Sequence, residues 1–328
     1  MGTDNRSVAI ACQGGGSHTA FAAGVLARVF EDVPEGYSID GFSGTSGGAI
    51  TAAAAWDALR REGPDAVPDR VHSLWDAIAT ATPTEQLANY YNVWWAGMEI
   101  SGAPIPSISP YDSPTAWAGQ EQLREDIERY VDFDRAVEPD DPALYVSTVD
   151  VLAGKFRTFG PAEVTTDVLL ASAAAPIVFP AVDLDGRPHW DGLFAFNPPL
   201  KPLLTEPADV ADKPDEIWLV RVNPDERETE PRTLRAIADR RRELSGDISL
   251  KEQIDFIDRV SEWVEAGYLP RDEYKSVTVR PLQLSKTLPL RSRIDRDPDL
   301  IWDLFECGRS TADDFLGELP RSQPVSQA

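Results

Sequence analysis

The sequence predicts an α/β fold in which helices cover a mostly parallel central sheet. Two strand-turn-helix units follow one another within the first 60 residues, an arrangement typical of parallel sheets. The chain of 328 residues is 42% hydrophobic and contains nine tryptophans, so it can bury a sizeable core. This length suits a single α/β domain that carries an insertion.

The two units share one plan. In the first, the apolar run 7–12 predicts a strand, Gly14 to Gly16 form a tight turn, and apolar residues recur at helical spacing over 20–30. The second occupies 39–59, where a short extended segment and an alanine-rich helix flank the turn Gly44-Thr45-Ser46-Gly47-Gly48. Both turns therefore lie at the carboxyl end of a predicted strand.

Later segments extend this pattern. An aromatic stretch with many prolines at 90–117 predicts an insertion or cap, because closely spaced prolines block long helices. We also expect a hairpin at 144–159, a helix at 168–174, a strand at 181–183 before the Asp185-Gly186 turn, strands at 216–222 and 276–284, and helices at 234–267 and 300–316. One domain is expected over 1–317, with a helical C-terminal part at 232–317 and a flexible tail at 318–328.

The charge balance is strongly acidic. The chain has 55 acidic and 31 basic residues, a formal net charge of -24 and a pI near 4.4. This charge disfavours nucleic acid as a partner and electrostatic docking on anionic membranes. It leaves open a transient, apolar contact with a membrane surface. Because only six basic residues are lysine, we interpret the surface as an adaptation to high salt, with an ordinary acidic protein as the alternative.

The sequence contains no apolar run of the roughly 18 residues that a membrane span requires, and no signal-peptide pattern. Its two cysteines, Cys12 and Cys307, are too few for a disulfide framework. These features predict a soluble, cytoplasmic protein that is at most peripheral at a membrane. They do not predict an oligomeric state.

The second glycine-rich turn carries a candidate nucleophile. Gly44 to Gly48 match G-x-S-x-G between a strand and a helix, the setting of a nucleophile elbow. The flanking glycines relieve crowding at a sharp turn that exposes the Ser46 hydroxyl. The N–H of Gly47 and the dipole of the following helix can stabilise an oxyanion. This pentapeptide alone is a modest signal, since such clusters are common in loops.

The base that partners this serine is less obvious. The three histidines are His18, His72 and His189, and none follows Asp191, so the usual order serine, acid, histidine is absent. A triad in another order stays open on geometry, but we expect a structural role for His72. His189 shares a face with Asp191 if the segment is extended, and could neighbour the site. Otherwise the base is a carboxylate, and Asp191, between apolar residues, is a candidate whose basicity burial would raise. An ordinary turn aspartate is the alternative.

The first glycine-rich turn offers backbone N–H groups. Gly14, Gly15 and Gly16 between a strand and a helix can converge on an anion. Nucleotide binding is disfavoured, because Thr19 replaces the third glycine of a dinucleotide motif and no lysine is near. The scattered histidines show no metal-ligand spacing. We therefore predict an oxyanion hole here, and neither metal nor cofactor.

Five sequence blocks carry a family resemblance. They are Cys12-Gln13-Gly14-Gly15-Gly16-Ser17-His18-Thr19-Ala20-Phe21 with Gly24-Val25-Leu26, then Gly44-Thr45-Ser46-Gly47-Gly48-Ala49, Ala171-Ser172-Ala173-Ala174-Ala175-Pro176, Trp190-Asp191-Gly192 and Asn197-Pro198-Pro199-Leu200. In this order they closely resemble bacterial and archaeal patatin-like phospholipases over a motif core at 7–205. The resemblance implies a three-layer α/β/α fold and hydrolysis of lipid acyl esters. By position, it makes Ser46 the nucleophile, Asp191 the base and Gly14 to Gly16 the oxyanion loop.

The chain departs from the family pattern at three positions. His18 and Thr19 stand where the glycine loop usually ends in a basic residue and a glycine, and Leu193 stands where a small residue usually follows the dyad. The departures at Thr19 and Leu193 favour, as one alternative, a binding or regulatory protein without catalysis. Acyl transfer to another alcohol is a second alternative. The aromatic stretch 90–117 either forms or gates an acyl pocket or belongs to the core.

Overall fold

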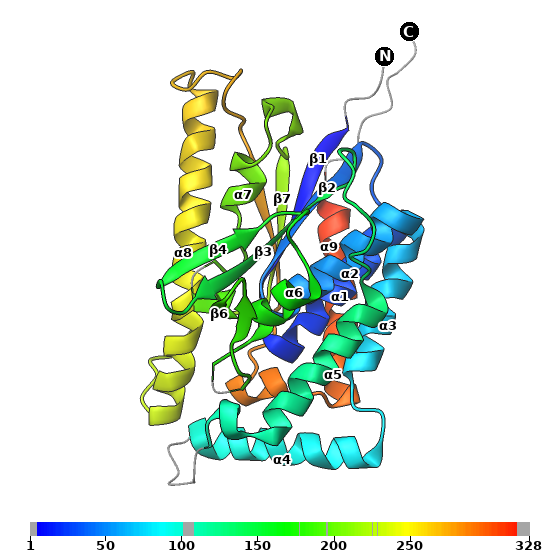
Figure 1. Ribbon diagram of the computed structural model, residues 1–328. Helices are drawn as coiled ribbons and strands as arrows, with labels where there is room; N and C mark the ends of the chain where they lie inside the picture. The colour runs from blue at the N-terminus through cyan, green and yellow to red at the C-terminus, as the bar shows by residue number, and fades with distance from the viewer. Residues whose placement is uncertain are drawn as a thin grey trace.

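The computed structural model describes residues 5–100, 108–176, 178–194, 196–224, 226–227 and 229–319. Within these residues an eight-stranded sheet has the order β5-β6-β3-β2-β1-β7-β8, and β4 also pairs with β3 (Figure 1). The strands are β1 Arg6–Cys12, β2 Tyr37–Gly44, β3 Ala143–Asp150, β4 Lys155–Phe159, β5 Val182–Leu184, β6 Arg187–Asp191, β7 Glu216–Arg221 and β8 Thr278–Gln283. Strands β3, β2, β1, β7 and β8 run parallel, and β4 and β6 run antiparallel to β3.

Helices cover both faces of this sheet. They are α1 Ala20–Glu31, α2 Gly47–Glu62, α3 Val67–Ile78, α4 Pro83–Ile100, α5 Pro114–Tyr130, α6 Thr166–Ala173, α7 Lys201–Thr205, α8 Leu234–Glu265 and α9 Pro298–Glu318. Short 3-10 turns include η1 Gly16–Thr19, η3 Pro110–Asp112, η4 Gly192–Phe194 and η6 Leu290–Ile294. The predicted α/β class with a mostly parallel sheet is confirmed.

Side chains of each strand alternate between two cores, because successive residues of a strand point to opposite faces. In β1, Val8 and Ile10 pack with α1, α2, α3 and α9 on one face. Ala9 and Ala11 pack on the other face with residues of α7 and α8. Figure 1 shows α8 on one side of the sheet and α1, α2, α3 and α9 on the other. The fold is thus a three-layer α/β/α arrangement.

Two glycines allow α1 and α9 to pack very closely. A Cβ atom on Gly24 would lie 1.9 Å from the Phe305 carbonyl oxygen, and one on Gly308 would lie 2.0 Å from that of Phe21. Neither position has room for a side chain. The last long helix is therefore seated directly on the first one.

The aromatic stretch differs from the sequence prediction. Instead of an irregular segment throughout, it is helical at both ends: residues 90–100 belong to α4, a helix of 18 residues, and residues 114–117 begin α5, a helix of 17. Pro83 and Pro114 each begin a helix, where a proline costs no hydrogen bond. Residues 101–107 lie outside the described residues. The expectation of no long helices was therefore wrong for residues 90–100 and 114–117, whereas Pro110 lies in the 3-10 turn η3 between the two helices.

The predicted C-terminal tail is only partly described. α9 continues to Glu318, and Leu319 is buried against the core. Residues 320–328 lie outside the described residues. Ordered structure therefore includes Glu318 and Leu319, the first two residues of the range 318–328.

Candidate active site

Ser46 lies in a strained turn between β2 and α2. Its backbone has φ 56° and ψ −134°, a left-handed conformation that costs energy for any residue with a side chain. The turn is very crowded. A Cβ atom on Gly44 would lie 2.6 Å from the Ala49 Cα, and one on Gly48 would lie 2.4 Å from the Cys12 carbonyl oxygen. Only glycine fits on both sides of the serine.

Hydrogen bonds hold this turn in place. The Ser46 N–H donates to the Ser172 hydroxyl of α6 at 2.9 Å. Beside it, the Thr45 hydroxyl donates to the Phe196 carbonyl at 2.7 Å and contacts the Ser147 hydroxyl at 2.8 Å. Since the serine's own N–H is already engaged, it is not free to bind a substrate anion.

Asp191 ends β6, and its carboxyl group interacts with the Ser46 hydroxyl. Its backbone N–H donates to the Ala174 carbonyl at 3.0 Å, and its Oδ1 accepts the Leu193 N–H at 2.9 Å. Burial raises the pKa of Asp191 to about 7, despite the opposing effects of the Ser46 hydroxyl, the Leu193 N–H and the Arg293 charge. This carboxyl group can therefore exchange a proton near neutral pH.

The glycine loop, Gly14 to Gly16, lies against Ser46. A Cβ atom on Gly14 would be 2.9 Å from the Ser46 Cβ, and one on Gly47 would be 3.0 Å from the Gly16 carbonyl oxygen. The Gly14 N–H donates to Asn197 Oδ1 at 2.6 Å. In contrast, the N–H groups of Gly15, Gly16 and Gly47 donate to no acceptor within the described residues. Gly14 thus sits beside the serine with its own N–H engaged.

Gly16 needs its glycine backbone for two reasons. It adopts φ 59°, and a Cβ atom there would lie 2.1 Å from the Arg293 carbonyl oxygen of η6. The Arg293 guanidinium hydrogen-bonds Asn223 Oδ1. Its charge also lowers the pKa of Asp191. A segment nearly 280 residues later in the chain therefore supports the loop.

A buried polar cluster supports the loop from behind. Gln13 Nε2 donates to Asp247 Oδ1 at 2.8 Å, and Gln13 Oε1 accepts the N–H groups of Val222 and Asn223, each at 2.9 Å. Asn223 Nδ2 also donates to Asp247 Oδ1 at 3.0 Å. Burial raises the pKa of Asp247. Asp247 of α8 and the residues that follow β7 thus hold Gln13, which immediately precedes the three glycines.

α8 also approaches the segment that follows Asp191. A Cβ atom on Gly246 would lie 2.7 Å from the Leu193 carbonyl oxygen and 3.4 Å from the Asn197 Cβ. Close contact is possible only because this helical residue is a glycine. Gly246 and Asp247, consecutive residues of α8, therefore support the segment that follows Asp191 and, through Gln13, the three glycines.

The histidines have separate surroundings. His18 Nε2 lies 2.8 Å from the Ser292 hydroxyl, and burial followed by the Arg293 charge lowers the pKa of His18 to about 3. His189 shares the buried face of β6 with Asp191, but its Nδ1 lies 2.7 Å from the Thr148 hydroxyl. Burial is the main cause that lowers the pKa of His189. Both side chains are therefore neutral neighbours of the site at pH 7.

His72 lies away from this site. It is exposed on α3, where its ring stacks on Trp302 with centroids 4.4 Å apart and meets Phe305 edge-on. The His72 side chain therefore takes part in the packing of α3 against α9.

Thr19 and Leu193, two of the three departures from the family pattern, both make hydrogen bonds within the site. The Thr19 hydroxyl donates to the Gly16 carbonyl at 2.6 Å, so threonine closes the loop with a hydrogen bond of its own. Leu193 contributes its backbone N–H to Asp191, an interaction that does not depend on its side chain. Neither residue displaces Ser46 or Asp191.

A family comparison agrees with this arrangement. The model of a family described as patatin-like phospholipase matches residues 10–204, more than half of the chain. The chain belongs to the patatin-like phospholipase family. Membership supports a lipid acyl hydrolase in general terms. The matched range contains Ser46, Asp191 and the glycine loop, whereas the patatin-like chain draws Asp247 and Arg293 from beyond it.

Other comparisons are more distant. The crystal structure of VipD from Legionella pneumophila aligns with this patatin-like chain at a TM-score of 0.39 and 13% identity, covering 96% of this chain and 67% of that one. No curated protein matches the chain significantly.

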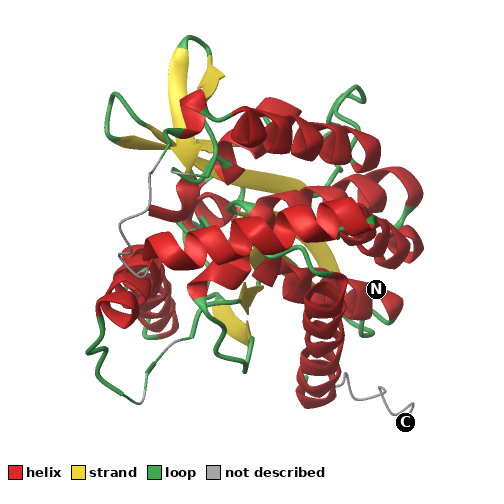
Figure 2. Cartoon of the chain, turned by 90° about the horizontal axis from the view of Figure 1, so that it is seen from below, coloured by secondary structure: helices red, strands yellow, loops and turns green. Residues whose placement is uncertain are grey.

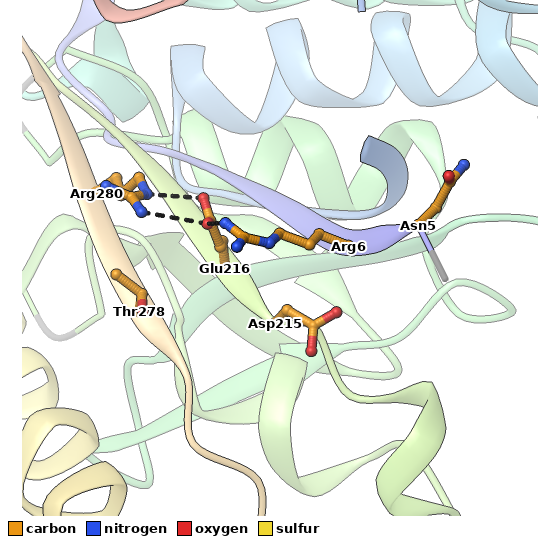
Figure 3. A pocket seen from close by; sticks show the side chains of 6 residues that line it. All are labelled: Asn5, Arg6, Asp215, Glu216, Thr278 and Arg280. Carbon is orange, nitrogen blue, oxygen red and sulfur yellow. Dashed lines mark hydrogen bonds and ion pairs between the residues drawn. The ribbon is translucent and has the colours of Figure 1, made fainter. Parts of the chain in front are cut away.

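A hollow of about 470 Å³ lies at the opposite, amino-terminal ends of β1, β7 and β8 (Figure 3). Its charged groups already pair with one another. Glu216 binds Arg6 at 3.2 Å and Arg280 at 2.8 Å, and Asp215 binds Lys275 at 2.8 Å. It is an ion-pair cluster that ties these strand ends together.

In the described part of this patatin-like chain, no group of three or more His, Cys, Asp or Glu side chains is arranged to hold a metal ion. None of its helices has both the length and the apolar character needed to cross a bilayer.

Several residues of the site had no assigned role in the sequence prediction. Ser172 and Asn197 fall within the family blocks, but nothing local indicated that they bind Ser46 and Gly14. Asp247 and Arg293 lie on distant helical segments and carry no motif. Only their position beside the glycine loop and Gln13 reveals them.

Proposed function

We propose that this patatin-like chain hydrolyses carboxylic esters of lipids, with Ser46 as nucleophile and Asp191 as general base. The observation that carries the proposal is the pairing of a serine in a strained elbow with a buried carboxyl group whose pKa is raised to about 7. At neutral pH, about half of this group is ionised and able to accept a proton. A solvated aspartate would be a much weaker base.

The reaction takes place in two steps. Asp191 accepts the Ser46 proton while the serine oxygen bonds to the ester carbonyl carbon, and collapse of the tetrahedral intermediate expels the alcohol, which takes that proton. Water then attacks the acyl-serine, again giving a proton to Asp191, and the carboxylic acid leaves as Ser46 recovers its proton. Each step needs only these two side chains and water.

The oxyanion would be bound by backbone N–H groups. Gly15, Gly16 and Gly47 supply the proposed donors, since their N–H groups have no acceptor among the described residues. Gly14 then acts as a spacer, because Asn197 takes its N–H and its missing side chain admits Ser46. Loss of one such donor typically costs about 10²- to 10³-fold in kcat.

The proposal is tested with Ser46→Ala and Asp191→Asn. Both should reduce hydrolysis of p-nitrophenyl esters by at least about 10³-fold, since each removes a reacting group. Ser43→Ala is the matched control, because this nearby buried hydroxyl has no hydrogen-bond partner and should leave the rate within about twofold. Full activity in folded Ser46→Ala would refute the assignment.

Two other functions give different results in the same system. A binding protein without catalysis would not label with a fluorophosphonate, whereas the proposed enzyme labels at Ser46. An acyltransferase would form the ester of an added alcohol in preference to free acid. The accommodated Thr19 and Leu193 favour an intact catalytic site over the non-catalytic alternative.

A further inference from the structure

Helix α4 carries its apolar face outward. Leu87, Tyr90, Tyr91, Trp94 and Trp95 follow the spacing of a single helix face, and all five are exposed. Tyr90 and Tyr91 are 67% and 61% exposed, and Trp94 is 46% exposed. These aromatics are therefore not core, which was one of the two roles expected for them. Large exposed apolar faces usually mark a contact site.

The opposite face of α4 is held to the protein by polar contacts. Asn89, one of its few buried side chains, donates to Asp295 Oδ1 at 2.7 Å and accepts the Arg296 N–H at 2.9 Å. Gly97, two turns further along the helix, faces the Arg291 side chain. The usual amphipathic arrangement is thus reversed, with the amide of Asn89 inward and aromatic rings in solvent. Folding alone does not explain that orientation, because burying the rings would release more free energy.

This aromatic face lies at the same end of the molecule as the candidate active site. α4 packs on η6, and η6 contacts the glycine loop through the Arg293 carbonyl and Gly16. In Figure 1, α4 crosses the end of the molecule toward which β1 runs, and Figure 2 looks at the molecule from that end. A shallow hollow of about 210 Å³ lies among Tyr90, Tyr91 and Trp94.

The charge of this face points to the kind of partner. Residues 86–98 contain no charged side chain, in a protein of which 26% is charged and whose net charge is -24. Tyrosine and tryptophan are the residues that favour the boundary between water and lipid. The absence of lysine and arginine gives anionic headgroups nothing to bind. Neutral or zwitterionic headgroups match both properties.

We propose that the aromatic face of α4 binds the surface of a neutral or zwitterionic lipid aggregate and holds the active site against it. The choice of lipid as the partner rests on the proposed function, but surface binding itself does not require catalysis. The helix lies on the interface and does not cross it, which agrees with its length and exposed position.

The test uses full-length Ser46→Ala protein and phosphatidylcholine vesicles in a flotation assay. The double substitution Tyr91→Ala/Trp94→Ala should weaken binding by about tenfold or more, since two rings leave the lipid contact. Trp263→Ala is the matched control, because Trp263 is 40% exposed and lies in the last turn of α8. In Figure 1 the C-terminal end of α8 lies away from α4. Trp263→Ala should bind like the parent protein.

Vesicle composition and activity provide the second part of the test. Adding phosphatidylglycerol should weaken binding at low salt, because the protein is acidic. In the Ser46-containing enzyme, the double substitution should lower the ratio of vesicle hydrolysis to hydrolysis of a soluble short-chain ester, and Trp263→Ala should not. This ratio separates loss of the surface from loss of the catalytic site.

Several results would overturn the inference. Absence of binding to phosphatidylcholine, or equal binding by both variants, would show that α4 is not the lipid contact. A requirement for anionic lipid would contradict the charge argument. Light scattering that finds a dimer in the parent protein and a monomer in the double variant would make this face a subunit interface. Ester hydrolysis that persists in Ser46→Ala would refute the proposed nucleophile and leave vesicle binding unaffected.

Discussion

The carboxyl group of Asp191 occupies surroundings that disfavour its charge. Burial raises its pKa to about 7, and only the Ser46 hydroxyl, the Leu193 N–H and the charge of Arg293 partly offset that effect. A base whose pKa lies near the working pH is well suited to proton transfer. The same desolvation that makes the group reactive also costs folding free energy.

This pKa leads to a pH-dependent rate. In the proposed mechanism only ionised Asp191 accepts the serine proton, so ester hydrolysis should rise with pH through about 7 and level off above it. The measurement is kcat/KM for a soluble ester between pH 5 and pH 9. A profile that is flat across this range, with the fold intact, would exclude Asp191 as the titrating base.

The stability of the protein should show the opposite dependence on pH. The Asp191 pKa is raised from 3.8 to about 7 on folding, so the folded state binds more protons in that interval and loses stability as pH rises through it. The shift corresponds to roughly 4 kcal/mol at full ionisation. Asp191→Asn should lack this loss and be more stable than the parent at pH 8, as denaturant unfolding at pH 5 and pH 8 can check.

At the scale of elements, α1 and α9 share the closest helix contact of the fold described above. Gly308 faces the Phe21 carbonyl and Gly24 faces that of Phe305, with no space for a Cβ atom at either glycine. α9 is the last helix of the described chain, so this contact fixes the C-terminal part against the first layer. The helix also contributes Ile301 and Leu304 to the main core.

Replacing Gly308 by alanine should therefore destabilise the protein. The methyl group would force α9 away from α1, at a cost of about 1–3 kcal/mol, and the melting temperature should fall. Gly317→Ala on the same helix is the control, because nothing lies within 4 Å of a Cβ atom there. That change should be neutral or slightly stabilising, since alanine favours helix. Equal effects of the two substitutions would contradict close packing as the cause.

At the scale of the whole molecule, the acidic surface should make stability depend on salt. A net charge of -24 produces repulsion among like charges, and screening by salt relieves it. We expect the melting temperature at pH 7 to rise from low salt to 1 M KCl. Near the pI of about 4.4 the gain should nearly vanish. If the melting temperature rose by a similar amount at both pH values, salt would be acting by strengthening apolar burial and not by screening charge.

The order of strands and helices could be predicted from local patterns. The strands at 7–12 and 216–222 and the helices at 20–30 and 234–267 lie where hydrophobic spacing predicts them. The main error concerned the stretch 90–117, where no long helix was expected: residues 90–100 lie in α4, and Pro114 begins α5 instead of breaking a helix. Spacing also shows that α4 has an apolar face, but not whether that face points inward.

The sequence by itself determined the features that depend on neighbouring residues. Glycines around Ser46 and at Gly14 to Gly16 indicate tight turns, because few other residues adopt or tolerate such backbones. The composition likewise set the net charge. These properties need no knowledge of which distant segments meet.

Only the tertiary structure decided which distant groups act on those turns. It brings one of 55 acidic residues, Asp191, to the Ser46 hydroxyl, and it engages the Gly14 N–H with Asn197. It also sets Asp247 behind Gln13 and turns the aromatic face of α4 toward solvent. The physical reason is that burial, pKa and exposure depend on packing between segments far apart in the chain.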